Sequence, residues 1–168
     1  MKILQYLLIS LSHKILKLLP YTSIKILSVP IGTLYFLLTF RSSIKLFRRK
    51  EIFNELKINY KPLIVKINYT RYWLETLWLT NNNFSKYISP HVEIENLEYV
   101  EKLKKQYPGL IFALPHLGNW EFAIPIGNSI KLNLLAVAEP LNNSYVLNWF
   151  KSLRESLGIE IILSLIHI

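Results

Sequence analysis

The sequence predicts an α/β fold, a mostly parallel sheet with flanking helices, preceded by amino-terminal membrane-associated helices. Strand-like and helix-like segments alternate through the second half of the chain, as in parallel sheets built with helical crossovers. The 168 residues suffice for one domain with a hydrophobic core. Residues 1–66 hold 12 Lys/Arg against two Glu, a net charge of +10, whereas residues 67–168 hold eight against nine, or −1. This basic excess flanks apolar segments, which indicates a membrane surface rather than nucleic acid as the partner.

Two apolar stretches, residues 3–19 and 24–40, open the chain. Each approaches the length of a transmembrane helix, but lysines interrupt both, and Pro30 and Gly32 interrupt the second. We therefore expect one or two helices that lie in, or dip into, the cytoplasmic face of the membrane.

Five cations follow the second stretch within ten residues and alternate with apolar side chains. As part of an interfacial helix, each cation contributes about 1 kcal/mol near an anionic leaflet, and the cluster marks the cytoplasmic side. The alternative is an ordinary solvated helix face. The cations are Arg41, Lys45, Arg48, Arg49 and Lys50.

The middle of the chain is expected to be helical over residues 51–79, with a break or kink near Pro62. Tyr69, Tyr72 and Trp73 form an aromatic stripe on this helix, which we interpret as packing against the sheet in preference to lining an acyl-chain groove. Residues 81–83 are expected to form a loop, 92–95 a short strand and 96–107 a helix.

The central strand is predicted over residues 110–114, which are apolar throughout, as a strand covered on both faces must be. Pro115 ends the run and His116 follows. Gly118 and Asn119 then permit a tight turn and a helix cap, and Glu121 lies five residues after His116. A histidine at the carboxyl end of a buried strand lies where open α/β sheets bind their ligands.

A second block lies downstream. The block at residues 136–140, which contains Glu139, is expected to supply a strand, and a helix with Arg154 near its end leads into a strand over residues 159–162. Strand, helix and strand in this order predict a parallel pair.

Four segments of this chain resemble the bacterial lipid A and phosphatidylinositol mannoside acyltransferases, members of the lysophospholipid acyltransferase superfamily. The matching segments run from about residue 20 to 162 and include an HxxxxE motif; two of them, Arg-Tyr-Trp and Val-Ala-Glu, look closer to the mannoside branch. They are Leu-Pro-His116-Leu-Gly-Asn-Trp-Glu121, Val-Ala-Glu139-Pro-Leu, Arg154-Glu-Ser-Leu-Gly-Ile-Glu-Ile and, more loosely, Tyr69-Thr-Arg71-Tyr-Trp-Leu-Glu75.

The resemblance implies a glycerolipid acyltransferase-like fold and an O-acyltransferase at the inner membrane. It would transfer a fatty acyl chain from a thioester, acyl-CoA or acyl carrier protein, to a hydroxyl of a membrane glycolipid, with no other cofactor. A non-catalytic membrane-anchored binding module on the same scaffold is the alternative.

Acyl transfer to an alcohol assigns roles to these residues. His116 would be the general base, and Glu121 would fix its tautomer and stabilise the imidazolium. The backbone N–H groups of Leu117, Gly118 and Asn119 would bind the oxyanion or a phosphate. Arg154 would bind donor phosphate or, by analogy within the family, pair with Glu139 to brace the site.

Each role has a structural alternative. An isolated histidine is more often a core residue hydrogen-bonded to a carbonyl, Glu121 suits the start of a helix, and Asn119 suits a helix cap. Trp120 is interpreted as packing. The chain has no cysteine, which excludes disulfides and thiol nucleophiles, and its histidines lack a pair at helical spacing, so no metal site is predicted.

We divide the chain into amino-terminal membrane-associated helices and basic cluster (1–50), a partial acyltransferase domain (51–162) and a non-native tail (163–168). The tail matches the translation of an adapter used in sequencing libraries, so His167 is no candidate for a site. The family's later motifs have no counterpart, so we expect a carboxyl-terminally truncated, inactive chain. Its last strand should leave an unpaired edge and an uncovered apolar face.

Overall fold

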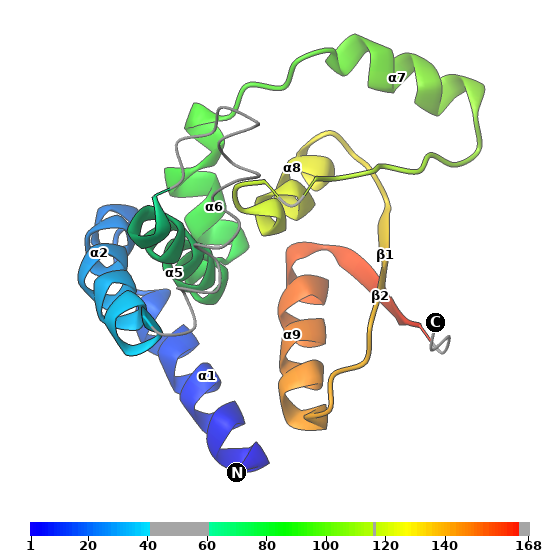
Figure 1. The fold of residues 1–168 in the computed structure, drawn as a ribbon. Coiled ribbons are helices and arrows are strands. Elements are labelled where there is room, and N and C mark those ends of the chain that lie inside the picture. The colour runs from blue at the N-terminus through cyan, green and yellow to red at the C-terminus, as the bar shows by residue number, and fades with distance from the viewer. Residues whose placement is uncertain (41–60, 116, 165–168) are drawn as a thin grey trace, which may run out of the picture. The chain divides into compact units, whose positions relative to one another are not determined.

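A computed structural model describes residues 1–40, 61–115 and 117–164. It divides the chain into two compact units. The first unit comprises Met1–Leu79 and Leu141–Trp149, and the second comprises Thr80–Pro140 and Phe150–Ile168. Figure 1 labels the elements of both. The predicted basic cluster of residues 41–50 and the first part of the predicted 51–79 helix lie outside the described residues.

The first unit is built on three helices, α1 (Lys2–Leu16), α2 (Tyr21–Leu38) and α5 (Pro62–Trp78). The first two confirm that both apolar stretches are helical. Helix α5 begins at Pro62, which agrees with the break expected there, because proline lacks only an N–H that the first turn leaves unpaired.

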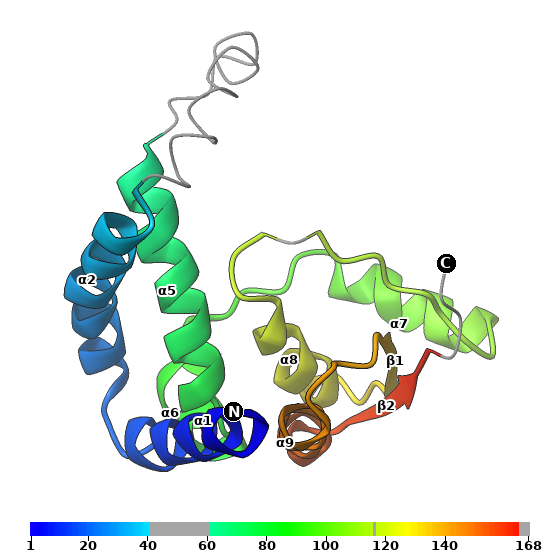
Figure 2. The same cartoon turned by 60° about the horizontal axis from the view of Figure 1, so that its bottom comes forward.

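Helices α2 and α5 lie side by side (Figure 2), and Gly32 is where their backbones come closest. A Cβ atom at Gly32 would lie 2.6 Å from the Cα of Ile67, so only glycine fits there. Ile24 and Ser28 are buried on the same face of α2. The aromatic stripe was expected to pack against a sheet, but the Tyr69 ring stacks on Tyr35 of α2 at 6.2 Å.

Polar contacts tie the carboxyl end of α5 to the two amino-terminal helices. The Tyr21 hydroxyl donates to Glu75 Oε1 at 2.7 Å, and Trp78 Nε1 donates to the Leu19 carbonyl at 2.9 Å. His13 Nδ1 lies 2.7 Å from the Leu77 carbonyl oxygen. Burial, and after it the hydrogen bond to Glu75, raises the pKa of Tyr21 above its usual range. Tyr21 is therefore a proton donor at neutral pH.

Residues 141–149 complete this unit on the inner side of α1. Asn143 Nδ2 donates to the Lys2 carbonyl at 3.0 Å and to Gln5 Oε1 at 2.9 Å. Rings also meet here, Tyr145 against Tyr6 at 6.1 Å and Trp149 against His13 at 5.5 Å. One side of α1 is thus held in place by side-chain contacts.

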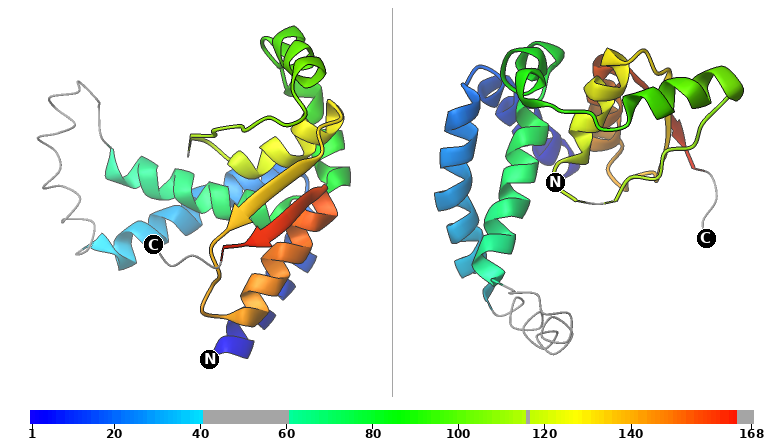
Figure 3. Two further views of the ribbon diagram at one scale, coloured as in Figure 1. Left: turned by 90° about the vertical axis from the view of Figure 1, so that its right-hand side faces the viewer. Right: turned by 90° about the horizontal axis from the view of Figure 1, so that it is seen from above.

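The second unit contains a two-stranded parallel sheet formed by β1 (Leu134–Ala138) and β2 (Ile159–Leu163). Helix α9 (Ser144–Leu157) connects the strands, which confirms the predicted strand, helix and strand, and Figure 3 shows both arrows pointing the same way. Gly158 makes the turn into β2 at a φ of +99°, which favours glycine, and a Cβ atom at this position would clash with the Asn128 side-chain amide.

The two faces of this sheet differ in exposure. Ile161 is buried, whereas Leu135, Val137 and Ile162 on the opposite face are exposed. Each strand has one neighbour in the part of the chain that the structure describes. Among the described residues, β2 therefore has one edge without a paired strand, and one face of the sheet carries exposed apolar side chains, as expected.

The predicted central strand over residues 110–114 was wrong. These residues form no strand, and Ile111 is fully exposed, with Phe112 and Leu114 about half exposed. A short apolar run indicates that a segment is hydrophobic. A strand also needs a neighbouring strand for its backbone hydrogen bonds, and the apolar pattern does not predict whether such a neighbour exists. Residues 92–95 form no strand for the same reason.

Shorter helices fill much of the remainder. Residues 81–83, expected as a loop, begin α6 (Asn81–Tyr87), because Thr80 Oγ1 accepts the Asn83 N–H at 3.1 Å and caps it. A single 3-10 turn, η1 (Ser89–His91), follows. The helix predicted over residues 96–107 is confirmed as α7 (Leu97–Gln106). Figure 1 shows a long extended segment between α7 and α8.

Candidate active site

The turn after the extended segment is built from short-range backbone contacts. The Leu117 N–H donates to the Pro115 carbonyl at 2.8 Å, and Gly118 has a φ of +63°, which favours glycine. Asn119 Oδ1 then accepts the Glu121 N–H at 3.1 Å and caps the 3-10 turn η2 (Trp120–Phe122), which leads into α8 (Ala123–Ser129). The predicted tight turn and helix cap are confirmed. His116 lies outside the described residues.

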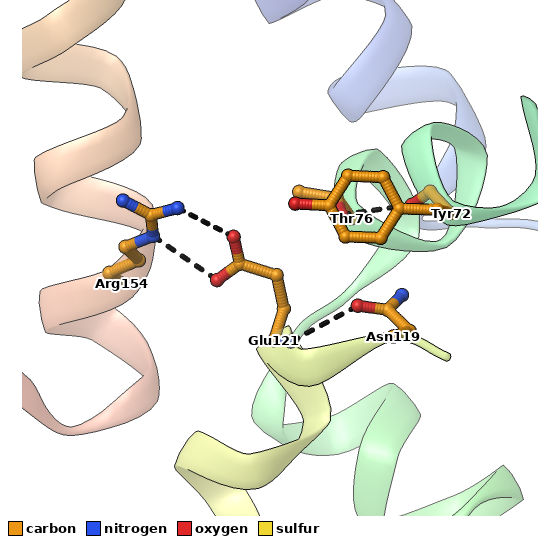
Figure 4. Close-up of polar contacts among 5 residues, drawn as sticks. All are labelled: Tyr72, Thr76, Asn119, Glu121 and Arg154. Carbon is orange, nitrogen blue, oxygen red and sulfur yellow. Dashed lines mark hydrogen bonds and ion pairs between the residues drawn. The ribbon is translucent and has the colours of Figure 1, made fainter. Parts of the chain in front are cut away.

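Glu121 is buried and makes a two-point ion pair with Arg154 (Figure 4). Arg154 Nε donates to Oε2 at 3.1 Å and Nη2 donates to Oε1 at 2.7 Å. The side chain of Glu121 is 2% exposed and that of Arg154 is 19% exposed. Paired hydrogen bonds between a guanidinium and a carboxylate fix both groups in one plane, so this carboxylate has a single orientation.

Two aromatic rings hold the guanidinium in turn. Its central carbon lies 4.9 Å from the ring centre of Trp120 and 5.7 Å from that of Phe150. Rings at these distances attract a cation through their electron-rich faces. Trp120 was expected to be a packing residue, and its ring packs against the Arg154 guanidinium that pairs with Glu121.

The partner of Arg154 differs from the one that the resemblance implied. Glu139 is exposed, one residue past the end of β1. Arg154 instead forms its salt bridge with Glu121, 33 positions earlier in the chain. The sequence contains a partial signal for this pairing. Glu121 lies just before one predicted helix and Arg154 lies near the end of another, and both helices adjoin the predicted parallel strands.

The arrangement allows a defined chemical role for Glu121. A carboxylate has about four acceptor positions, so two hydrogen bonds from Arg154 leave others for a second donor such as an imidazole N–H. A carboxylate held in this way can also stabilise a cation that forms nearby. Within residues 1–40, 61–115 and 117–164, no three His, Cys, Asp or Glu side chains gather as a metal site would require.

A family model described as bacterial lipid A biosynthesis acyltransferase matches residues 1–164. No curated protein and no solved structure matches the chain.

Proposed function

The chain belongs to the bacterial lipid A biosynthesis acyltransferase family, and we propose that it transfers a fatty acyl chain from a thioester to a hydroxyl of a membrane glycolipid. The family is that of a lipid acyltransferase, a transferase whose substrates are lipids and acyl donors. The proposal adds the donor, acyl-CoA or acyl carrier protein, and the acceptor, a glycolipid of the lipid A or phosphatidylinositol mannoside type. It also adds the cytoplasmic face of the inner membrane as the place of reaction.

The observation that carries the proposal is the buried ion pair between Glu121 and Arg154, which is joined by two hydrogen bonds. Glu121 lies five residues after His116 in the sequence. A buried ion pair contributes little net stability compared with apolar side chains of the same size. A carboxylate held this firmly, five residues after a histidine in the sequence, supports the proposal, because a general base needs a fixed partner of this kind.

In the proposed reaction His116 takes the proton from the acceptor hydroxyl as its oxygen attacks the thioester carbonyl carbon. The new carbon–oxygen bond gives a tetrahedral intermediate, which collapses as the carbon–sulfur bond breaks. The imidazolium then returns its proton to the departing thiolate, so no proton is gained or lost overall. Glu121 stabilises the imidazolium, and Arg154 is a positioning residue that acts through Glu121.

The oxyanion of the intermediate needs hydrogen-bond donors. We assign this role to the backbone N–H groups of Gly118 and Asn119, in the turn between His116 and Glu121. The Leu117 N–H already donates to the Pro115 carbonyl at 2.8 Å, so it contributes only if that bond breaks. Glu139 follows the carboxyl end of β1, where sheets of this kind bind ligands, and we retain it as a substrate contact.

The test is release of free thiol from acyl-CoA, and separately from acyl carrier protein, by the full-length protein. Thiol release that depends on an added glycolipid acceptor is the expected result, with the acyl chain recovered on that lipid. Lipid binding without any thiol release from either donor would instead favour the non-catalytic binding module.

A further inference from the structure

Helix α1 has two different sides. The inner side holds Tyr6 and His13, which contact rings of Tyr145 and Trp149, and Leu16 is buried there. The outer side is an exposed apolar stripe at helical spacing, in which every side chain is at least half exposed. We call it the α1 stripe; it consists of Ile3, Leu4, Leu7, Leu8, Leu11 and Ile15.

The charged side chains of α1 and of the residues that follow it up to residue 40 are all positive. Lys14 lies within it and Lys17 follows it, both exposed, and residues 1–40 contain four lysines and no acidic residue. A second copy of this face would bring like charges together, whereas an anionic lipid surface would complement them. The chemistry of the stripe therefore fits a bilayer better than another copy of the chain.

Helix α2 is the helix, among those the structure describes, that is long and apolar enough to cross a membrane. Its packing on α5 argues against a crossing. The buried Glu75 accepts from Tyr21 near one end of α2, and Lys66 lies over the Tyr35 ring at 4.3 Å near the other. Between them lies Arg71, whose Nε is buried without a hydrogen-bond partner among the described residues. A crossing by α2 would carry these groups into hydrocarbon, where they are costly.

We propose that α1 lies in the plane of an anionic bilayer, with the α1 stripe at the boundary between headgroups and acyl chains, and that α2 does not cross. At 15 residues α1 is shorter than a spanning helix, and its inner side is occupied by protein. The proposal rests on the lipid-acylating function above, because an enzyme that acts on a membrane lipid must hold its site at that surface.

The first test replaces stripe residues with charge and uses a control of matched exposure. Leu7→Glu/Leu11→Glu changes side chains that are 54% and 56% exposed, and Leu135→Glu changes one that is 54% exposed on the sheet of the second unit. Binding to phosphatidylglycerol vesicles should fall about 10-fold or more for the first variant only. Equal loss in both, or loss in neither, would overturn the proposal, as would a shift from dimer to monomer in the first variant with binding unchanged.

The second test measures depth and sidedness, which the absence of cysteine makes possible through single-cysteine variants. A fluorophore at Leu4, Leu11 or Ile15 spans about 16 Å along α1 on one side of the helix. Lipids brominated at one depth should quench all three equally if α1 lies in the plane; graded quenching would show that it inserts endwise.

For α2, cysteines at Thr22 and Leu38 mark its two ends, both exposed. An impermeant maleimide should label both in inverted inner-membrane vesicles and neither in spheroplasts. Labelling of one end from the periplasmic side would show that α2 crosses. His116→Ala should leave all these results unchanged, so failure of the catalytic proposal and failure of the docking proposal give different outcomes.

Discussion

The two units both bury polar groups and expose apolar side chains, but the partners of the buried groups differ. In the first, the α1 stripe and the outer side of α2 expose large aliphatic side chains, and polar groups such as Glu75 lie against neighbouring helices. In the second, an ion pair is buried in the site while apolar residues of the sheet and the 110–114 segment face outward. Burial alone thus does not separate core from function in this protein, and what decides is the partner of each group.

The sharpest way to separate the units is to disable the proposed base. His116→Ala should lower acyl transfer by about 100- to 10,000-fold, the usual contribution of a positioned general base, with vesicle binding unchanged. Thiol release and vesicle sedimentation measure the two properties on one preparation. Residual activity within a few-fold of the unmodified protein would remove His116 from the mechanism.

Breaking the buried ion pair should destabilise the second unit. Arg154→Ala leaves the Glu121 carboxylate buried and unpaired, which typically costs about 3–5 kcal/mol in unfolding free energy. The matched control is Lys151→Ala on the same helix, whose pair with Glu155 at 3.7 Å is exposed and should cost less than about 1 kcal/mol. Urea unfolding measures both.

A second variant keeps this test informative about catalysis. Glu121→Gln/Arg154→Met replaces the pair with neutral side chains and should recover most of the stability, yet leave acyl transfer low. Full activity in this double variant would show that the pair is structural only.

The close approach of the α2 and α5 backbones at Gly32 is the feature of the first unit that a single substitution disrupts most directly. Gly32→Ala places a Cβ atom 2.6 Å from the Ile67 Cα, and the forced separation of α2 and α5 should cost about 1–3 kcal/mol. Gly109→Ala, where a Cβ would meet nothing within 4 Å, is the control and should be neutral within about 0.5 kcal/mol. Equal melting temperatures for the two variants would contradict the packing described here.

The smallest expected effect is a dependence on alkaline pH in the first unit. The folded protein holds the Tyr21 proton more tightly than the unfolded chain, because burial raises the pKa of this hydroxyl. Its contribution to stability is therefore complete below about pH 10 and is lost as the pH rises further. Tyr21→Phe should flatten the decline in melting temperature above pH 10, and Tyr99→Phe, at an exposed tyrosine, should not.

Local patterns predicted the regular elements well. Helices α1, α2 and α7, the second part of the 51–79 helix and the succession β1, α9, β2 were all expected from periodicity and from glycine and proline positions. The turn at Gly118 and the cap at Asn119 were likewise expected. These features depend on residues a few positions apart, which is the range over which a sequence pattern acts.

Distant relationships were predicted poorly. The 110–114 run is apolar enough for a buried strand, yet no strand pairs with it in the described part of the chain. The aromatic stripe was correctly recognised, but Tyr69 meets Tyr35 of α2 and not a sheet. Arg154 was expected to pair with Glu139 and pairs with Glu121, because which carboxylate an arginine reaches depends on how β1 and α9 fold back.

The pairing of Glu121 with Arg154 also affects when the site forms during refolding. Since 33 positions separate the two residues, the chain between them must close into a loop before the charges meet, and that stretch contains α8, β1 and most of α9. The competent site should therefore assemble late in refolding, after the strand and helix are in place. Recovery of enzymatic activity would then trail recovery of helical signal, and a mutation that slows β1 would slow the appearance of the enzyme without altering its chemistry.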